Sequence, residues 1–267
     1  MGEFMKYKLL AADMDGTLLR DGSVLSERTR AAVTSAVERG ALFVLSTGRP
    51  LCGVGFVVDA FDDDLPLILC NGAVVVMGKS RKPLLLRNLP FESARDVFDQ
   101  GGRRGFPVIV WVGERLFVSR DCELVQKYRS ITNAPMRVID DMEEFRDEGV
   151  NKMLWIIPPE DSRLLQDEMD AHFKGRVTCH TSQSHLMEFT GEGVTKASAL
   201  AEIGKMYGID RAEMVAVGDG YNDLSMLQYA GLGVAMGNAP EEIRGLCDEV
   251  TLTNNEDGVA AVAEKYF

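Results

Sequence analysis

The stretch LLAADMDGTL, residues Leu9–Leu18, decides how the rest of this chain is interpreted. It begins with four uncharged residues, Leu9–Ala12, a pattern typical of a strand that helices cover on both faces of a parallel sheet. Asp13 and Asp15 follow at the predicted carboxyl end of this strand. Open α/β sheets bind ligands beyond these strand ends, so both acids are expected at a ligand site. The alternative is an acidic turn that only solvates the strand end, because Asp-Gly is common in turns.

The next part of the chain predicts a second strand that ends beside the first. A helical pattern over Ser26–Arg39 is followed by the apolar run Ala41–Ser46. Two parallel strands joined through a helix form a right-handed crossover, which places both strand ends at the same edge of the sheet. Thr47, Gly48 and Arg49 follow the second strand, so they are expected beside the two acids.

A third buried strand is predicted at Pro66–Cys70, with a tight turn at Asn71–Ala73. The acidic run Asp62–Asp64 before it is interpreted as a solvated loop and not as a metal site, because adjacent side chains point apart. From about Pro83 to Glu188 the pattern changes to shorter strands separated by helical stretches, which predicts a second α+β unit. No turn there combines an acid, a glycine and a hydroxyl, so this unit is expected to face the substrate.

The C-terminal part repeats the pattern of the first part. Thr195 is a good N-cap for a helix that ends at Gly208, which puts Lys196 in the first helical turn. The helix dipole disfavours a cation there by about 0.3–1 kcal/mol. Either an anion binds this lysine or its side chain points into solvent. The apolar run Met214–Val217 then predicts a fourth strand that ends in Gly218–Asp223.

This last turn gathers polar groups at a strand end. Asp219, Asn222 and Asp223 supply oxygen atoms, and Gly218 and Gly220 allow close approach of the backbone. Carboxylate oxygens suit Mg²⁺, a lysine and backbone N–H groups suit phosphate, and a carboxylate can attack phosphorus. The polar residues at the strand ends therefore predict phosphoryl transfer through an aspartyl-phosphate.

The composition limits the possible functions. The chain has 267 residues, 46% of them hydrophobic, which is enough for one large domain or two modest ones. The formal net charge of -12 argues against non-specific binding of nucleic acid, but it allows a small anionic substrate in a locally positive pocket. The sequence has no apolar run of membrane-spanning length and no export signal. A cytoplasmic location without membrane contact is therefore expected.

Cysteines and histidines predict no metal site. His172, His180 and His185 lack the spacing of metal ligands, which favours surface or core positions. The five cysteines are scattered without paired spacing and are interpreted as small buried hydrophobic residues: Cys52, Cys70, Cys122, Cys179 and Cys247.

Taken together, the motifs resemble those of the haloacid dehalogenase-like hydrolase superfamily, and more narrowly its Cof-type sugar-phosphatase branch. Two further turns, Asn71–Ala73 and Gly233–Ala239, are also similar to turns of that branch. The four principal motifs occur in the family's order: Asp13–Leu18, Thr47–Arg49, Lys196 and Gly218–Asp223.

The resemblance implies an α/β fold with a Rossmann-like parallel-sheet core domain and an inserted α+β cap domain of a C2B-like type. The core would comprise residues 5–82 and 190–267, and the cap residues 83–189. The sequence departs from the family's pattern at Ala197, where glycine is more usual, and no chemical consequence is expected.

The resemblance also implies roles at a magnesium site. Asp13 would be the nucleophile and a Mg²⁺ ligand. Asp15 would be the general acid and base, with its backbone carbonyl on the metal. Asp219 would ligate Mg²⁺ directly, and Asp223 would either ligate it or orient the groups that do.

The remaining site residues would bind substrate. Thr47 and Lys196 would hold the phosphoryl oxygens, Gly48 and Arg49 would contact the substrate, and Asn222 would lie by the phosphate.

The implied function is a Mg²⁺-dependent phosphatase that hydrolyses small phosphorylated metabolites, sugar phosphates foremost, through an aspartyl-phosphate on Asp13. A phosphomutase is the alternative, because a phospho-aspartate can return its phosphoryl group to a sugar. A non-catalytic protein that binds sugar phosphates would be expected to lack Asp13 or Asp15, and both are present.

Overall fold

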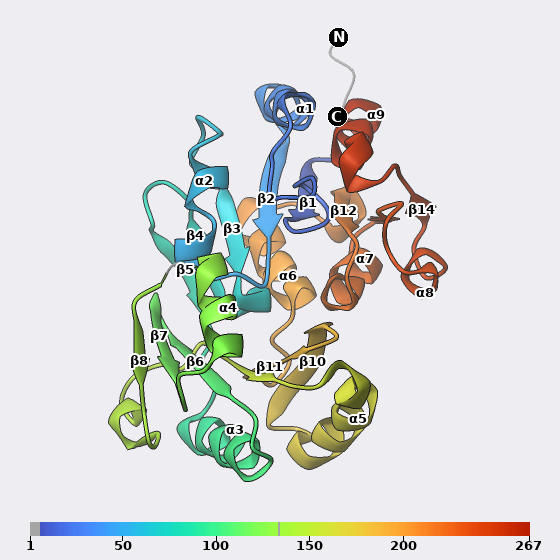
Figure 1. Cartoon of the computed structure of the whole chain (residues 1–267). Coiled ribbons are helices and arrows are strands. Elements are labelled where there is room, and N and C mark those ends of the chain that lie inside the picture. The colour runs from blue at the N-terminus through green and yellow to red at the C-terminus, as the bar shows by residue number, and fades with distance from the viewer. Residues whose placement is uncertain (1–5, 133) are drawn as a thin grey trace.

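The computed structural model describes residues 6–132 and 134–267, and it contains two β-sheets (Figure 1). Residue 5, at which the core was predicted to begin, lies outside the described residues. The smaller sheet is built from one continuous part of the chain, residues 108–191, so it is an insertion into the chain of the larger sheet. We call residues 89–191 the inserted unit and the rest of the described chain the core unit.

The larger sheet is parallel except at one edge. Its strands are β1 (Leu9–Asp13), β2 (Leu42–Ser46), β3 (Pro66–Leu69), β4 (Val74–Met77), β5 (Pro83–Leu86), β12 (Met214–Gly218), β13 (Leu232–Ala235) and β14 (Glu249–Val250). They lie in the order β14-β13-β12-β1-β2-β3-β4-β5, and the pairs β3–β4 and β4–β5 are antiparallel. The strand that carries the two acids is therefore central, with parallel neighbours β2 and β12.

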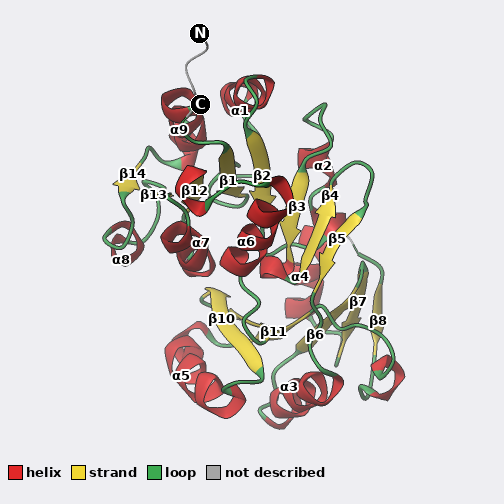
Figure 2. Ribbon diagram, turned by 180° about the vertical axis from the view of Figure 1, so that it is seen from behind, coloured by secondary structure: helices red, strands yellow, loops and turns green. Residues whose placement is uncertain are grey.

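Strand β1 is buried on both faces, as its uncharged sequence predicts. Leu10 and Ala12 pack in the cluster that includes α1 (Glu27–Glu38) and α9 (Gly258–Tyr266). Leu9 and Ala11 face the opposite way, toward α6 (Lys196–Tyr207) and α7 (Leu224–Tyr229). Figure 2 shows α6 and α7 in front of the strands in that view. The alternation of neighbouring side chains thus builds a helix–sheet–helix core.

Short helices complete the connections of the core unit. They are α2 (Gly55–Val58) after β2 and α8 (Glu241–Arg244) after β13. The predicted helix at residues 26–39 is α1, and Ser26 caps it by accepting a hydrogen bond from the Thr29 N–H at 3.0 Å.

The inserted unit is a six-stranded sheet with helices on both faces. The strand order is β10-β11-β9-β6-β7-β8. Helices α3 and α5 share one hydrophobic cluster on one face, and α4 packs on the other face, where it contacts residues Leu51–Gly53 of the core unit. The elements are α3 (Phe91–Arg103), β6 (Val108–Val112), β7 (Arg115–Val118), α4 (Glu123–Thr132), β8 (Met136–Val138), β9 (Lys152–Ile156), α5 (Ser162–Phe173), β10 (Val177–Gln183) and β11 (Leu186–Gly191).

The predicted boundaries at residues 83 and 189 differ from the sheet pairing. Strand β5 starts at Pro83 but pairs with β4 in the larger sheet, with Val74 opposite Leu86. Strand β11 continues past residue 189, and Gly191 still pairs with Val177 of β10. Apolar runs such as Pro83–Leu86 look alike in either sheet, so only the strand partners decide where the insertion begins.

Two predictions about surface and core residues have different outcomes. The run Asp62–Asp64 is exposed, as expected for a solvated loop. The interpretation of all five cysteines as buried is wrong for Cys52, which is exposed in the middle of the segment Leu51–Gly53. Cys122 and Cys247 are only partly buried, and Cys70 and Cys179 are buried. Among residues 6–132 and 134–267, no helix is long and apolar enough to cross a membrane.

Candidate active site

The carboxyl ends of β1, β2 and β12 meet at one edge of the larger sheet. Asp13, the last residue of β1, pairs with Ser46, the last residue of β2. A cavity of about 270 Å³ opens at this edge. Its wall includes every predicted site residue except Lys196: Asp13, Asp15, Thr47, Gly48, Arg49, Asp219, Asn222 and Asp223.

Lys196 is fully buried against two of these residues. Its Nζ donates to Asp13 Oδ1 at 2.5 Å, to Asp223 Oδ1 at 2.5 Å and to the Ser46 carbonyl at 3.1 Å. Burial lowers the pKa of Lys196, but the two carboxylates outweigh it and raise the pKa above its usual value. The lysine is therefore charged and bound to anions, and the alternative of a side chain that points into solvent is excluded.

Three carboxylates form a cluster with an excess of negative charge. Asp13, Asp219 and Asp223 each place one oxygen within 4.8 Å of the others. Burial and the charge of Asp223 raise the pKa of Asp13 well above its usual value, and the same two causes raise that of Asp219 to about 6. If all three are ionised, Lys196 compensates only one charge. An all-oxygen set with two uncompensated charges fits a hard divalent cation such as Mg²⁺.

Asp219 is held by neighbours from two other turns. Its Oδ1 accepts from Thr17 Oγ1 at 2.9 Å, and its Oδ2 accepts from Asn238 Nδ2 at 3.3 Å. Gly16 has φ +75, and a Cβ there would lie 2.5 Å from Asp219 Oδ2. Glycine at this position therefore allows both the turn and the close approach of the two loops.

Asp223 organises the turn that carries Asp219. Its Oδ2 accepts from the backbone N–H groups of Asp219 and Gly220, at 3.1 and 2.9 Å, while its Oδ1 bonds Lys196. Both oxygens thus have partners within the protein. Asp223 therefore positions the turn that carries Asp219, and it also contributes an oxygen to the carboxylate cluster.

Asp15 lies outside the carboxylate cluster and pairs with Arg49. Its two oxygens accept from Arg49 Nη2 at 2.5 Å and Nε at 2.8 Å. The guanidinium predicted to contact substrate therefore contacts the predicted acid in this structure. Thr47 Oγ1 accepts from the Arg49 backbone N–H at 3.1 Å, which leaves the hydroxyl proton of Thr47 free to donate to a ligand.

Asn222 contacts the turn at Asn71–Ala73, which was predicted from the sequence without a functional role. Its Nδ2 donates to Asn71 Oδ1 at 3.1 Å. Cys70 and Asn71 have φ values of 50 and 55, the left-handed region. Gly72 has φ +104, and a Cβ there would lie 2.2 Å from the Thr195 carbonyl, so this turn packs directly on the start of α6.

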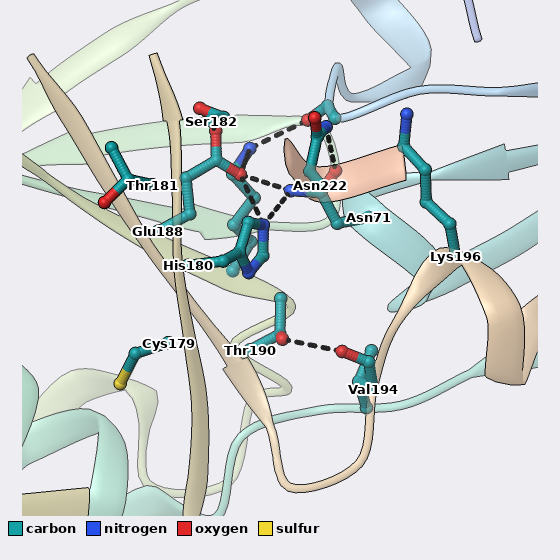
Figure 3. Close-up of polar contacts among 12 residues, drawn as sticks. Asn71, Cys179, His180, Thr181, Ser182, Glu188, Thr190, Val194, Lys196 and Asn222 are labelled. Carbon is teal, nitrogen blue, oxygen red and sulfur yellow. Dashed lines mark hydrogen bonds and ion pairs between the residues drawn. The ribbon is translucent and has the colours of Figure 1, made fainter. Parts of the chain in front are cut away.

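The sequence analysis missed the residues that the inserted unit adds to the cavity wall. Lys152 and Glu188 form a buried ion pair at 2.5 Å. His180, predicted at the surface or in the core, is half-buried with its Nε2 2.6 Å from Asn71 Nδ2 (Figure 3). A lysine in the mostly apolar strand KMLWI and a glutamate in the mostly apolar strand LMEFTG are unusual, so the sequence could have indicated Lys152 and Glu188 as candidate site residues. The added wall residues are Tyr128, Lys152, Ser182, Gln183, Leu186 and Glu188.

Known proteins resemble the chain over nearly its whole length. The family model described as haloacid dehalogenase-like hydrolase matches residues 10–262. YxeH of Bacillus subtilis (strain 168) is 31% identical over 261 residues, 95% of this chain and 96% of that protein. A haloacid dehalogenase-like hydrolase from Bacteroides thetaiotaomicron has a crystal structure with a TM-score of 0.85 and 29% identity, covering 98% of this chain and 100% of that one.

Two further relatives carry names that state an activity. YitU of Bacillus subtilis (strain 168), a 5-amino-6-(5-phospho-D-ribitylamino)uracil phosphatase, is 29% identical over 98% of each chain. The structure of the sugar phosphatase BT4131 has a TM-score of 0.83 and 25% identity, covering 97% of this chain and 98% of that one.

The chain therefore belongs to the haloacid dehalogenase-like hydrolase family, in its Cof-type branch. Within that family it is a phosphomonoester hydrolase.

Proposed function

We propose that this phosphatase depends on Mg²⁺ and hydrolyses small phosphorylated metabolites, sugar phosphates foremost, through an aspartyl-phosphate on Asp13. The observation that carries the proposal is the position of the Asp13 carboxylate. It lies in the cavity wall, bonded to Lys196 and within 4.8 Å of two other carboxylates. The positive charges of Lys196 and of a bound divalent cation would favour the ionised form of this buried carboxylate, which nucleophilic attack requires.

Asp13 and Asp219, with the backbone carbonyl of Asp15, would hold the metal ion, and Asp223 would position Asp219. A bound Mg²⁺ supplies the positive charge that the carboxylates and the phosphoryl oxygens together require. The remaining contacts to the phosphoryl group come from Lys196 and the Thr47 hydroxyl, which are fixed by hydrogen bonds before substrate enters.

In the first step, an oxygen of Asp13 attacks phosphorus while the bond from phosphorus to the ester oxygen breaks. Asp15, released from Arg49 and carrying the proton that it took from water in the preceding turnover, gives this proton to the leaving alkoxide, which departs as an alcohol. In the second step, Asp15 takes a proton from a water molecule that attacks the same phosphorus. The bond between Asp13 and phosphorus then breaks, and inorganic phosphate leaves.

We propose the inserted unit as a separate cap domain that covers the cavity and contacts the organic part of the substrate. Tyr128, Gln183 and Leu186 extend from it into the cavity wall. The cavity volume of about 270 Å³ suits a phosphate with a small organic group. The activities in the names of YitU and BT4131 support the same class of substrate.

A panel of phosphorylated metabolites tests the proposal. Wild-type protein with Mg²⁺ should release inorganic phosphate from at least one small phosphomonoester, and Asp13→Asn should release none. Isomerised sugar phosphate without net phosphate release would instead identify a phosphomutase. Failure of the wild type to turn over any phosphomonoester would overturn the proposal.

A further inference from the structure

The ion pair between Lys152 and Glu188 belongs to the inserted unit, yet both side chains contact the core unit. We propose that Lys152, held by Glu188, is a positioning residue for the turn Thr47–Arg49. This inference rests on the proposed function, because it assigns the Thr47 hydroxyl to the phosphoryl group.

The pair is deeply buried within the smaller sheet. Lys152 begins β9 and Glu188 lies in the adjacent strand β11, and their side chains are only 2% and 4% exposed. Burial favours the neutral form of Glu188, but Lys152 and His180 outweigh it and lower its pKa to about 2. Because buried ion pairs seldom stabilise a fold more than apolar side chains of similar size would, stability alone is a weak reason for this one.

The second contact of Lys152 crosses into the core unit. Its Nζ donates to the Gly48 carbonyl at 2.8 Å. That carbonyl belongs to the same planar peptide group as the Arg49 N–H, which donates to Thr47 Oγ1 at 3.1 Å. By fixing this peptide group, Lys152 fixes the direction in which the Thr47 hydroxyl presents its remaining proton.

Glu188 holds the neighbouring turn at the same time. It accepts from Asn71 Nδ2, and Ser182 Oγ donates to its other oxygen at 2.6 Å (Figure 3). Two backbone bonds of 3.1 Å join this turn to the first one, from the Asn71 N–H to the Thr47 carbonyl and from the Cys70 N–H to the Arg49 carbonyl. The left-handed conformation is costly for Cys70, whereas asparagine adopts it readily, so the contacts of Asn71 help to hold a turn that is strained at Cys70.

The ion pair therefore clamps both the turn at Thr47–Arg49 and the neighbouring turn at Asn71. The shape of the two turns then depends on how the inserted unit packs on the core unit. If Lys152 acts by positioning the groups that bind the phosphoryl group, its loss should lower kcat/KM by the same factor for every substrate, because all substrates share that group. A lysine that contacted the organic group would instead affect some substrates more than others. This difference separates a positioning role from direct recognition of the substrate.

The test compares Lys152→Met with Lys79→Met. Lys79 is a matched control, because its Nζ also donates to a backbone carbonyl, that of Asp62 at 2.7 Å, at an exposed site away from the cavity. We expect Lys152→Met to lower kcat/KM about 10- to 100-fold, by the same factor for a small aryl phosphate and for the best substrate of the panel. Inhibition by inorganic phosphate should weaken in parallel, and Lys79→Met should leave each value unchanged.

A second variant keeps the test valid if Lys152→Met is too unstable. The double variant Lys152→Met/Glu188→Gln leaves no unpaired buried charge from this pair, and it should show the same loss of kcat/KM. Hydrogen–deuterium exchange supplies a readout that does not depend on activity: the amides of Arg49 and Asn71 should exchange faster in the double variant than in the wild type.

The possible outcomes separate this inference from the proposed function. A loss confined to the larger substrate would show that Lys152 contacts the organic group, which overturns the positioning role and leaves the phosphatase intact. Unchanged kcat/KM and unchanged exchange in the double variant would also overturn it. An inactive wild type would overturn the proposed function, whereas the exchange rates would still test the clamp.

Discussion

Replacing Asp219 by asparagine should stabilise the metal-free protein while it removes activity. Burial and Asp223 raise the pKa of Asp219 to about 6, from a usual value of 3.8. Because the unfolded chain releases this proton at lower pH than the folded protein, the fold loses stability as pH rises from about 4 to about 6. A difference of about two in pKa corresponds to about 3 kcal/mol, which the ionised carboxylate costs the fold at neutral pH.

The substitution recovers most of this free energy. Asparagine keeps an acceptor for Thr17 Oγ1, but its amide loses the bond from Asn238 Nδ2, which is worth about 1 kcal/mol. The net gain in the free energy of unfolding is about 2 kcal/mol at neutral pH, or a rise in Tm of about 4–8 °C for a chain of this size.

Thermal unfolding followed by circular dichroism in the presence of a chelator measures this gain. The advantage of Asp219→Asn should shrink as pH falls from about 7.5 to about 4.5, where the wild-type carboxyl becomes protonated. Excess Mg²⁺ should raise the Tm of the wild type and not that of the variant. The wild type, less stable than the variant in chelator, should therefore become the more stable protein in Mg²⁺.

Asp257→Asn is the matched control. A hydrogen bond from Arg20 lowers the pKa of Asp257, so this carboxylate stabilises the fold at neutral pH and its replacement should lower Tm. If Asp219→Asn were less stable than the wild type in chelator at neutral pH, or if the difference did not vary with pH, the excess negative charge inferred at the site would be refuted.

Four further predictions address the chemistry and the fold. Chelation should abolish phosphate release and Mg²⁺ should restore it; activity that survives chelation would contradict the metal requirement. Asp15→Asn, given an aryl phosphate, should release one equivalent of phenol and then stall with the phosphoryl group on Asp13, which rapid quench and mass spectrometry detect; slow release without a trapped adduct would leave the double role of Asp15 unsupported. The low pKa of Glu188 stabilises the fold above about pH 4.5, and this stabilisation is lost as pH falls toward 2. The free energy of unfolding of Lys152→Met/Glu188→Gln, measured with urea, should therefore fall less than that of the wild type as pH is lowered toward 2. An equal fall in both proteins would count against a charged pair. Iodoacetamide should modify the exposed Cys52 before any buried cysteine, and peptide mass spectrometry can show the order.

The polar residues of the core unit could be located from the sequence because they directly follow buried strands. Asp13, Thr47 and Asp219 each come just after an apolar run, and parallel strands of one sheet place their carboxyl ends together. Lys196 could be located for a different reason, since a cation in the first turn of a helix requires an explanation. The sequence did not reveal that the anions beside it are Asp13 and Asp223.

The contribution of the inserted unit could not be predicted in the same way. Lys152 and Glu188 meet because β9 pairs with β11, and they reach the core unit only through the packing of one unit on the other. The two charges inside apolar strands can be noticed in the sequence, but neither the strand pairing nor the packing of the two units leaves a local pattern there.

The central position of β1 has a consequence for synthesis of the chain. One neighbour, β2, follows soon after it, whereas the other, β12, does not exist until the ribosome has passed Met214. The strands of the inserted unit are contiguous, so they can pair while β1 still has an open hydrogen-bonding edge. A nascent or truncated chain that ends before Met214 exposes this apolar edge to other chains. Premature termination should therefore produce aggregated protein in place of a soluble, partly active fragment.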